Sequence, residues 1–121
     1  MAEHILLLHG SRVLLDADLA ALYGVSTKRL NEQVKRNLDR FPADFRFQLS
    51  EAEFVGLRSQ FATSNASRGG RRYLPFAFTE HGAIMAASVL NSPHAIQVSV
   101  YVVRAFVQLR EALSQYREVA K

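Results

Sequence analysis

The stretch Leu19–Arg36 of this chain reads LAALYGVSTKRLNEQVKR, and it decides which fold is expected. It predicts two short helices joined at Gly24, because glycine adopts the left-handed conformation of a helix end at little cost. Asp16 can cap the first helix, and Ser26 or Thr27 can cap the second. A buried stripe at every fourth position is expected to hold the second helix to the core, and it consists of Leu30, Val34 and Leu38. Two helices joined in this way are typical of a helix-turn-helix, whose second helix can enter the major groove of DNA.

Basic residues are concentrated in two parts of the chain, whose net charge is +4. Between residues 28 and 40, five basic residues stand against two acidic ones. Between residues 58 and 72, four arginines occur without an acidic residue. The second part contains Gly69-Gly-Arg-Arg72, which suits a reaching arm because glycine lets the backbone approach closely and guanidinium groups bind phosphate or guanine bidentately. An isolated arginine cluster is more often simply solvated, but its coincidence with the helix pair favours a nucleic-acid partner.

The candidate DNA-binding residues divide by role. Phosphate contacts are expected from Lys35, Arg36 and Arg40. Contacts to base edges are expected from Thr27, Lys28, Asn31 and Glu32, on the side of the second helix turned away from the core. Arg29 belongs to the same basic segment, and the arm contributes Arg68, Arg71 and Arg72. Double-stranded DNA is the expected partner, because a helix that reads a groove needs a duplex.

The rest of the chain predicts an α+β domain in the order ββαα, then β-α-loop-β, then two helices. Two apolar runs, residues 5–8 and 12–15, flank His9-Gly10-Ser11 and predict a hairpin. Strict alternation in residues 45–49 predicts a half-buried strand, and Ser50-Glu-Ala-Glu53 is a capping box that opens a helix. Residues 62–70 carry no periodicity and predict a mobile loop.

The chain after this loop predicts one more strand and two helices. The strand covers residues 73–78, and Pro75 places it at a sheet edge or beside a bulge. Thr79 caps a helix to about Leu90, and Ser92-Pro93 begins a helix that runs to about Arg117.

The last helix carries two apolar stripes. The first consists of Ile96, Val100, Val103 and Val107, and the second of Val102, Phe106, Leu109, Leu113 and Tyr116. Both stripes are expected to be core up to about Val107. A helix of this length spans roughly 37 Å, which exceeds the diameter of a small domain, so its end is expected to project. We therefore expect one domain over residues 1–121, with 108–121 as a projecting helical tail and a homodimer seam at Leu109, Leu113 and Tyr116.

Five separate blocks of the sequence carry a family resemblance. They are LDADLAALYGV at 15–25, NLDRFPADF at 37–45, LRSQFATS at 57–64, GGRRYLPFAFTE at 69–80 and RAF at 104–106. From about residue 5 to 111 the chain resembles the KilA-N-related domain family of bacteriophages, bacteria and large DNA viruses, in particular its Orf-six-N branch. The resemblance implies a DNA-binding module, often the N-terminal part of phage antirepressor-like or regulatory proteins.

The wider family is similar to fungal APSES-type DNA-binding domains, in which a helix-turn-helix lies beside a winged β element. This likeness implies a winged-helix-like fold in which residues 27–38 form the reading helix. It also implies that the 68–72 loop and its neighbouring strands form the wing. The expected function is sequence-specific DNA binding in transcription regulation, similar to a phage antirepressor. The alternative is a protein-interaction module that sequesters a repressor through the last helix.

Other function classes lack their residues. The absence of cysteine excludes disulfides, thiol nucleophiles and thiolate metal sites. The four histidines are scattered, and Thr79-Glu80-His81-Gly82 is explained by the needs of a helix N-terminus. Acidic residues are not clustered as a magnesium site requires. We expect no enzyme activity, metal, cofactor or small-molecule substrate, and with no basic leader and no apolar run of about 20 residues we expect a cytoplasmic protein without a membrane partner.

Overall fold

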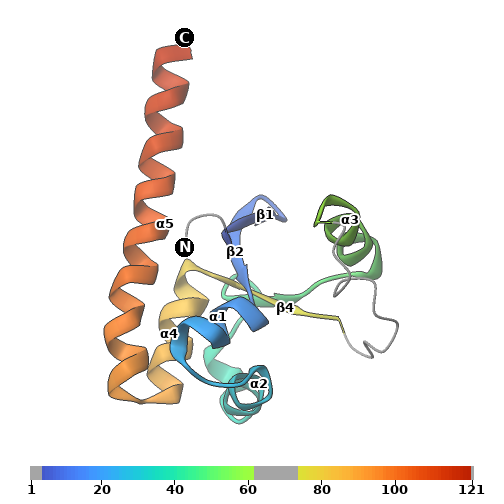
Figure 1. The fold of residues 1–121 in the computed structure, drawn as a ribbon, viewed down its shortest axis with the longest axis vertical. Helices are drawn as coiled ribbons and strands as arrows, with labels where there is room; N and C mark the ends of the chain where they lie inside the picture. The colour runs from blue at the N-terminus through green and yellow to red at the C-terminus, as the bar shows by residue number, and fades with distance from the viewer. Residues whose placement is uncertain (1–3, 62–73, 121) are drawn as a thin grey trace.

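The computed structural model describes the backbone of residues 4–61 and 74–120, and the side chains of residues 4–58 and 74–114. The described part is an α+β fold in which helices cover a four-stranded antiparallel sheet (Figure 1). Its elements in chain order are β1 (Leu6–Leu8), β2 (Ser11–Leu15), α1 (Asp16–Tyr23), α2 (Thr27–Lys35), the 3-10 turn η2 (Leu38–Arg40), β3 (Arg46–Gln48), α3 (Glu51–Phe61), β4 (Phe76–Thr79), α4 (Glu80–Leu90) and α5 (Pro93–Ala120). The expected fold class and element order are confirmed.

The hairpin of β1 and β2 closes through a two-residue turn. Leu8 pairs with Ser11, and His9 and Gly10 between them have φ angles of 54° and 74°. Two successive positive φ angles define the turn whose twist matches that of the flanking strands. Glycine at the second of these positions explains why the hairpin forms here.

Strand β4 lies inside the sheet, whose order is β1-β2-β4-β3. The expectation that Pro75 places this strand at an edge is therefore wrong, and the regular pairing of β4 with β3 from Phe76 onward shows no bulge in the ladder. Pro75 is buried and directly precedes Phe76, the first paired residue of β4. The missing N–H of Pro75 removes no hydrogen bond from the ladder, because the pairing of β4 begins at the next residue. The carbonyl of Pro75 accepts a 3.0 Å hydrogen bond from the Leu49 N–H.

Side-chain caps start most of the helices, as the sequence predicts. The hydroxyls of Ser26, Thr79 and Ser92 accept from main-chain N–H groups three residues later, at 3.0, 3.3 and 3.0 Å. Ser50 and Glu53 form the reciprocal capping box at 2.8 and 3.2 Å. These caps satisfy N–H groups that a helix start leaves unpaired.

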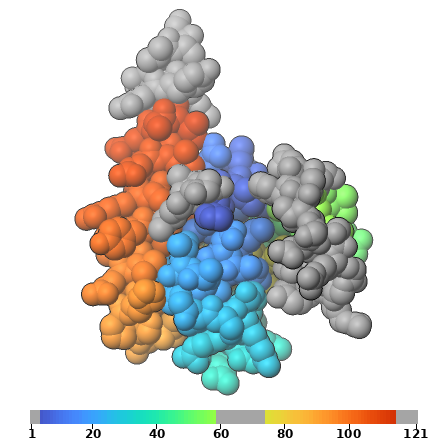
Figure 2. All heavy atoms as spheres, in the orientation of Figure 1, coloured from blue at the N-terminus to red at the C-terminus, as the bar shows by residue number. Residues whose placement is uncertain are grey.

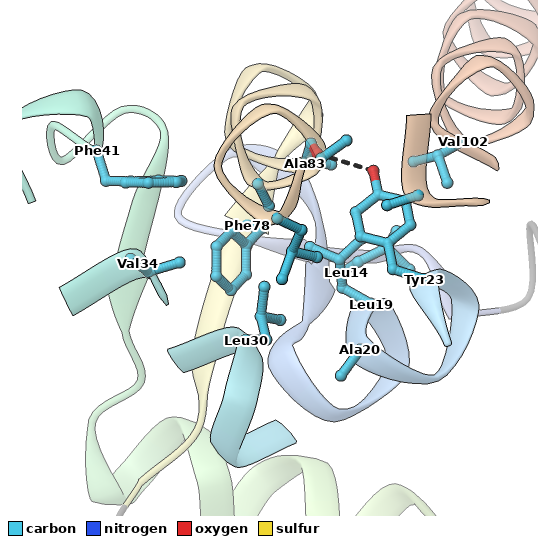
Figure 3. Close-up of a cluster of buried hydrophobic side chains, with 14 of the residues drawn as sticks. Leu14, Leu19, Ala20, Tyr23, Leu30, Val34, Phe41, Phe78, Ala83 and Val102 are labelled. Carbon is cyan, nitrogen blue, oxygen red and sulfur yellow. Dashed lines mark hydrogen bonds between the residues drawn. The ribbon is translucent and has the colours of Figure 1, made fainter. Parts of the chain in front are cut away.

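The main core lies between one face of the sheet and helices α1, α2, α4 and α5 (Figure 3). A smaller cluster on the other face of the sheet is built on Val13, Leu49 and Ala77 and receives side chains from α3. The largest side chains buried in the main core are Leu14, Leu19, Tyr23, Leu30, Val34, Phe78 and Val102. The sheet therefore separates α3 from the other four helices.

Helix α2 is shorter than expected, and this removes Leu38 from the core. The helix ends at Lys35, and the chain then turns into η2, where Leu38 is 53% exposed. The expected stripe of Leu30, Val34 and Leu38 is thus confirmed for its first two members and wrong for the third. A repeat of four residues keeps one face only while the helix continues.

Among its described side chains, helix α5 buries only the first two members of one of its two predicted stripes. Val102 and Phe106 are buried, whereas Ile96 is 49% and Val100 47% exposed. The expectation that both stripes are core up to Val107 is therefore wrong. The helix packs on α4 and α1, which cover one of its sides, and it extends beyond the sheet at its C-terminal end (Figure 1).

Candidate nucleic-acid interface

Helices α1 and α2 meet at Gly24, whose φ of 73° continues into a short connection to the Ser26 cap. Leu30 and Val34 are 0% exposed and hold α2 in the core, where it packs against α1 and α4. Because these two residues define the inner side of α2, the direction of its remaining side chains is fixed.

The outer side of α2 is basic and accessible. Four basic side chains are exposed there beside one exposed acid, Glu32. None of the four forms an ion pair within the part of the chain that the structure describes. The basic residues are Lys28, Arg29, Lys35 and Arg36. In Figure 2 the cyan segment that contains α2 lies at the lower surface of the molecule.

The other predicted site residues have different positions. Thr27 is half-buried in the first turn of α2, and Arg40 is exposed in η2, after the helix has ended. The arm residues Arg68, Arg71 and Arg72 lie outside the described residues. The structure therefore brings together the basic residues of α2 and leaves the relation of the arm to them as a prediction.

Asn31 lies at the border of the buried side of α2, which differs from the expectation that it faces solvent. It is half-buried, and its Nδ2 donates a 2.9 Å hydrogen bond to Oδ2 of Asp16. Its Oδ1 is buried and has no hydrogen-bond partner among the described residues. A bidentate contact to adenine needs both amide atoms, and in this position the Oδ1 is buried and the Nδ2 is engaged by Asp16.

Asp16 is the centre of this arrangement and is 0% exposed. Its Oδ1 accepts from the Ala17 N–H at 2.8 Å, and its Oδ2 accepts from the Phe76 N–H at 3.3 Å as well as from Asn31. Asp16 is the first residue of α1, and the cap position before it is Leu15, which makes no side-chain cap bond. The predicted role of Asp16 as a helix cap is therefore wrong. Asp16 instead links α1 to α2 and β4 through the hydrogen bonds that its carboxylate accepts.

Arg46 of β3 joins the same polar cluster, and sequence reasoning missed it. Its guanidinium carbon lies 3.6 Å from the centre of the Phe76 ring, and its Nε is buried without a partner among the described residues. Burial lowers the pKa of Arg46, and the negative charge of Asp16 opposes this shift. The alternating pattern of the strand signals only that Arg46 faces one side of the sheet, so no sequence feature connects it with Asp16.

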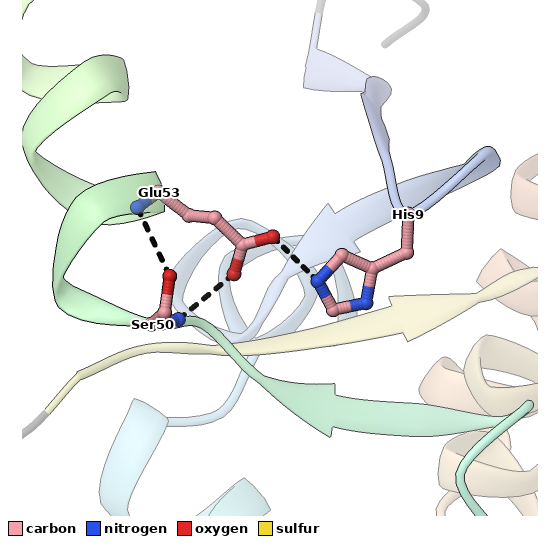
Figure 4. A network of polar contacts seen from close by, with 3 residues as sticks. All are labelled: His9, Ser50 and Glu53. Atoms are coloured by element: carbon pink, nitrogen blue, oxygen red, sulfur yellow. Dashed lines mark hydrogen bonds and ion pairs between the residues drawn. The ribbon is translucent and has the colours of Figure 1, made fainter.

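A second polar cluster attaches α3 to the hairpin (Figure 4). The His9 ring stacks on Phe47 with centroids 4.1 Å apart, and its Nε2 lies 2.5 Å from Oε2 of Glu53. The pKa of Glu53 is lowered, first by the hydrogen bond from the Ser50 N–H and further by His9. Helix α3 ends at Phe61, directly before the segment that carries the predicted arm. His9 and Glu53 thus position the element that leads into this segment.

A cleft of about 840 Å³ lies between the hairpin and α5. Its lining includes three apolar side chains, Leu7, Phe106 and Leu113, and the ion pair in which Arg110 lies 2.7 Å from Glu80. Within residues 4–61 and 74–120, no group of three or more histidine and acidic residues is placed to hold a metal ion. None of the helices in these ranges is both long and apolar enough to cross a membrane.

The family model of the ORF6N domain matches residues 3–89. The chain belongs to the ORF6N domain family. No curated protein and no solved structure matches this chain. The matched part of this ORF6N domain contains the helix pair and the basic segment 58–72, but it ends before α5, whereas the expected resemblance extended to residue 111.

Proposed function

We propose that this ORF6N domain is a non-catalytic module that binds double-stranded DNA sequence-specifically in transcription regulation, in the manner of phage antirepressors. The observation that carries the proposal is the outer side of α2. Four exposed basic side chains without ion pairs to described residues lie on α2 or on its C-cap residue Arg36, and the inner side of this helix is fully buried. Such cations gain most from a polyanion, because each phosphate contact releases condensed counterions.

The helix pair is proposed to act as a helix-turn-helix, with α2 in the major groove. Lys35, Arg36 and Arg40 would contact phosphates and fix the orientation of the domain. Thr27, Lys28 and Glu32 would contact base edges from the N-terminal part of α2, where recognition helices contact bases. Arg29 is also exposed and adds to the positive potential near the duplex.

Family membership supports a regulatory role, because the ORF6N domain is phage-associated. The further relationship to KilA-N domains, and through them to winged DNA-binding folds, is part of the proposal. Under it, Arg68, Arg71 and Arg72 belong to a wing that contacts the backbone of the same duplex. A cytoplasmic location follows from this function.

A selection from randomised duplexes tests the proposal. The protein should enrich a defined sequence, and Lys28→Ala should change the preferred bases at one or two positions. Arg104→Ala is the matched control, because Arg104 is an exposed cation on α5 and should leave the enriched sequence unchanged. Enrichment of no sequence at low salt would overturn sequence-specific binding.

The cleft beside α5 favours a second candidate, a protein-interaction module. Leu7 and Leu113 are exposed there, so a partner helix could bury apolar surface in it. This module would sequester a repressor or form a homodimer through Leu109, Leu113 and Tyr116, and it needs no DNA contact. Binding of a partner without any DNA affinity would favour this candidate.

A further inference from the structure

The Asp16 side chain continues the β-sheet at the point where the main chain leaves it. Leu15, the last residue of β2, pairs with Ala77, so the next pair of the antiparallel register would be Asp16 and Phe76. The ladder ends with the pair of Leu15 and Ala77, and the chain turns into α1 at Asp16. The carboxylate accepts the Phe76 N–H at 3.3 Å instead. The start of β4 is therefore fixed to the start of α1.

The same carboxylate oxygen accepts a 2.9 Å hydrogen bond from Asn31, in the middle of α2. The side chains of this helix that are fully buried are apolar, Leu30 and Val34. Apolar contacts are not directional, so they tolerate a small rotation or sliding of a helix. The hydrogen bond to Asp16 has a preferred distance and angle, and it adds the missing directional restraint.

We infer that Asp16 and Asn31 are positioning residues, which set the rotation of α2 relative to β4 and thereby direct its basic outer side toward DNA. The effect on DNA binding rests on the proposed function, whereas the effect on the orientation of α2 does not. Neither residue contacts DNA in this account. Asp16 is completely buried, and Asn31 has its Oδ1 buried and its Nδ2 bonded to Asp16.

The cost of the arrangement supports this role. A buried carboxylate loses its hydration, and an apolar side chain would hold α1 and β4 together more cheaply. Three hydrogen bonds, from α1, α2 and β4, offset that loss. A nearby cation, Arg46 on β3, adds electrostatic stabilisation. Unlike an apolar side chain, the Asp16 carboxylate permits a single orientation of α2.

The first test measures the orientation of α2 without DNA. Because the chain has no cysteine, spin labels can be placed at Lys28→Cys on α2 and Ser88→Cys on α4, both exposed positions. Asn31→Asp places a second carboxylate beside Asp16 and should widen the measured distance distribution. Gln33→Glu is the matched control, because it makes the same amide-to-carboxylate change on α2 away from Asp16 and should leave the distribution unchanged. A distribution in Asn31→Asp as narrow as in the unmodified chain would overturn the inference.

The second test measures discrimination, as the ratio of affinities for a selected and a random duplex at one salt concentration. Asn31→Asp should lower this ratio about tenfold relative to Gln33→Glu, which adds the same charge. Asp16→Asn should lower it similarly, and the double variant Asp16→Asn with Asn31→Asp should recover part of it. A merely structural loss would reduce both affinities equally and leave the ratio unchanged.

These outcomes separate the two proposals. A widened distribution in a protein that binds no duplex would support the positioning role and reject DNA binding. An unchanged distribution in a protein that binds DNA would reject the positioning role and support DNA binding. If Asn31→Asp lowers the ratio but Asp16→Asn does not, Asn31 is a base-contacting residue and the inference is wrong. Should Asp16→Asn fail to fold, Asn31→Ala, which removes the amide that donates to Asp16 and leaves the carboxylate in place, is added to the distance measurement and must widen the distribution.

Discussion

The hydroxyl of Tyr23 donates a 2.8 Å hydrogen bond to the main-chain carbonyl oxygen of Ala83 and joins α1 to α4 inside the core (Figure 3). Tyr23→Phe keeps the ring and removes this bond. The free energy of unfolding should fall by about 1 kcal/mol, because a buried carbonyl loses a donor. Urea unfolding at neutral pH measures the change, and equal stability of both proteins would show that the bond contributes nothing.

The same residue predicts a pH dependence. Burial raises the pKa of Tyr23 above its ordinary value of 10.0. The unfolded chain therefore releases this proton first, and stability should fall as the pH rises above about 10. Tyr23→Phe should flatten this part of the stability profile. A profile with the same slope in both proteins would contradict the assignment.

Gly82 and Gly56 form a matched pair for a test of packing. A Cβ at Gly82 would lie 1.9 Å from the carbonyl oxygen of Phe45, which the Thr79 N–H holds at 3.0 Å. Gly82→Ala should therefore destabilise the fold by about 3 kcal/mol or more, because main chain must move. Gly56 lies in α3 with open space around it, so Gly56→Ala should stabilise by about 0.5–1 kcal/mol. Thermal unfolding compares the two, and the opposite order would contradict the packing of α4 on the Phe45 backbone.

Local signals in the sequence predicted local structure well. The Gly24 turn, the Ser26 cap and the capping box at Ser50 each depend on residues within one helical turn, and all are confirmed. Two predictions that failed depend on where an element ends or which strand pairs beside it. Pro75 lies in an interior position only because Gln48 pairs beside it, and Leu38 leaves the core because the chain turns after α2.

The candidate site shows the same division. Periodicity identified the inner side of α2 through Leu30 and Val34, and with it the exposed Lys28 and Lys35. It could not show that Asn31, at the border between the two sides, is drawn inward. That position follows from Asp16, fifteen residues earlier, and no pattern within α2 contains this information.

The predicted arm is tested by Arg71→Ala combined with Arg72→Ala. If both side chains contact phosphates, affinity should fall for every duplex, and the slope of log affinity against log salt should decrease by about 1.8. Anisotropy titrations on one specific and one random duplex measure both quantities. Unchanged affinity would show that Arg71 and Arg72 do not contact DNA and would leave α2 as the proposed interface.

The proposed homodimer seam is tested at Leu113, which is exposed on the projecting part of α5. If the seam exists, Leu113→Glu should shift a dimer to a monomer, because it places charge in an apolar contact. Sedimentation at high micromolar concentration measures the mass. A clean monomer for the unmodified protein would reject the seam.

The central claim is that the basic outer side of α2 binds duplex DNA through its phosphates, and the salt dependence of affinity tests it most directly. With about six phosphate contacts, the affinity should fall on the order of a thousandfold between about 50 and about 200 mM monovalent salt. Reversing the charge at Lys35 and Arg36 should abolish binding at the lower concentration. An affinity that does not change with salt, or no binding to any duplex at about 50 mM, would contradict the claim.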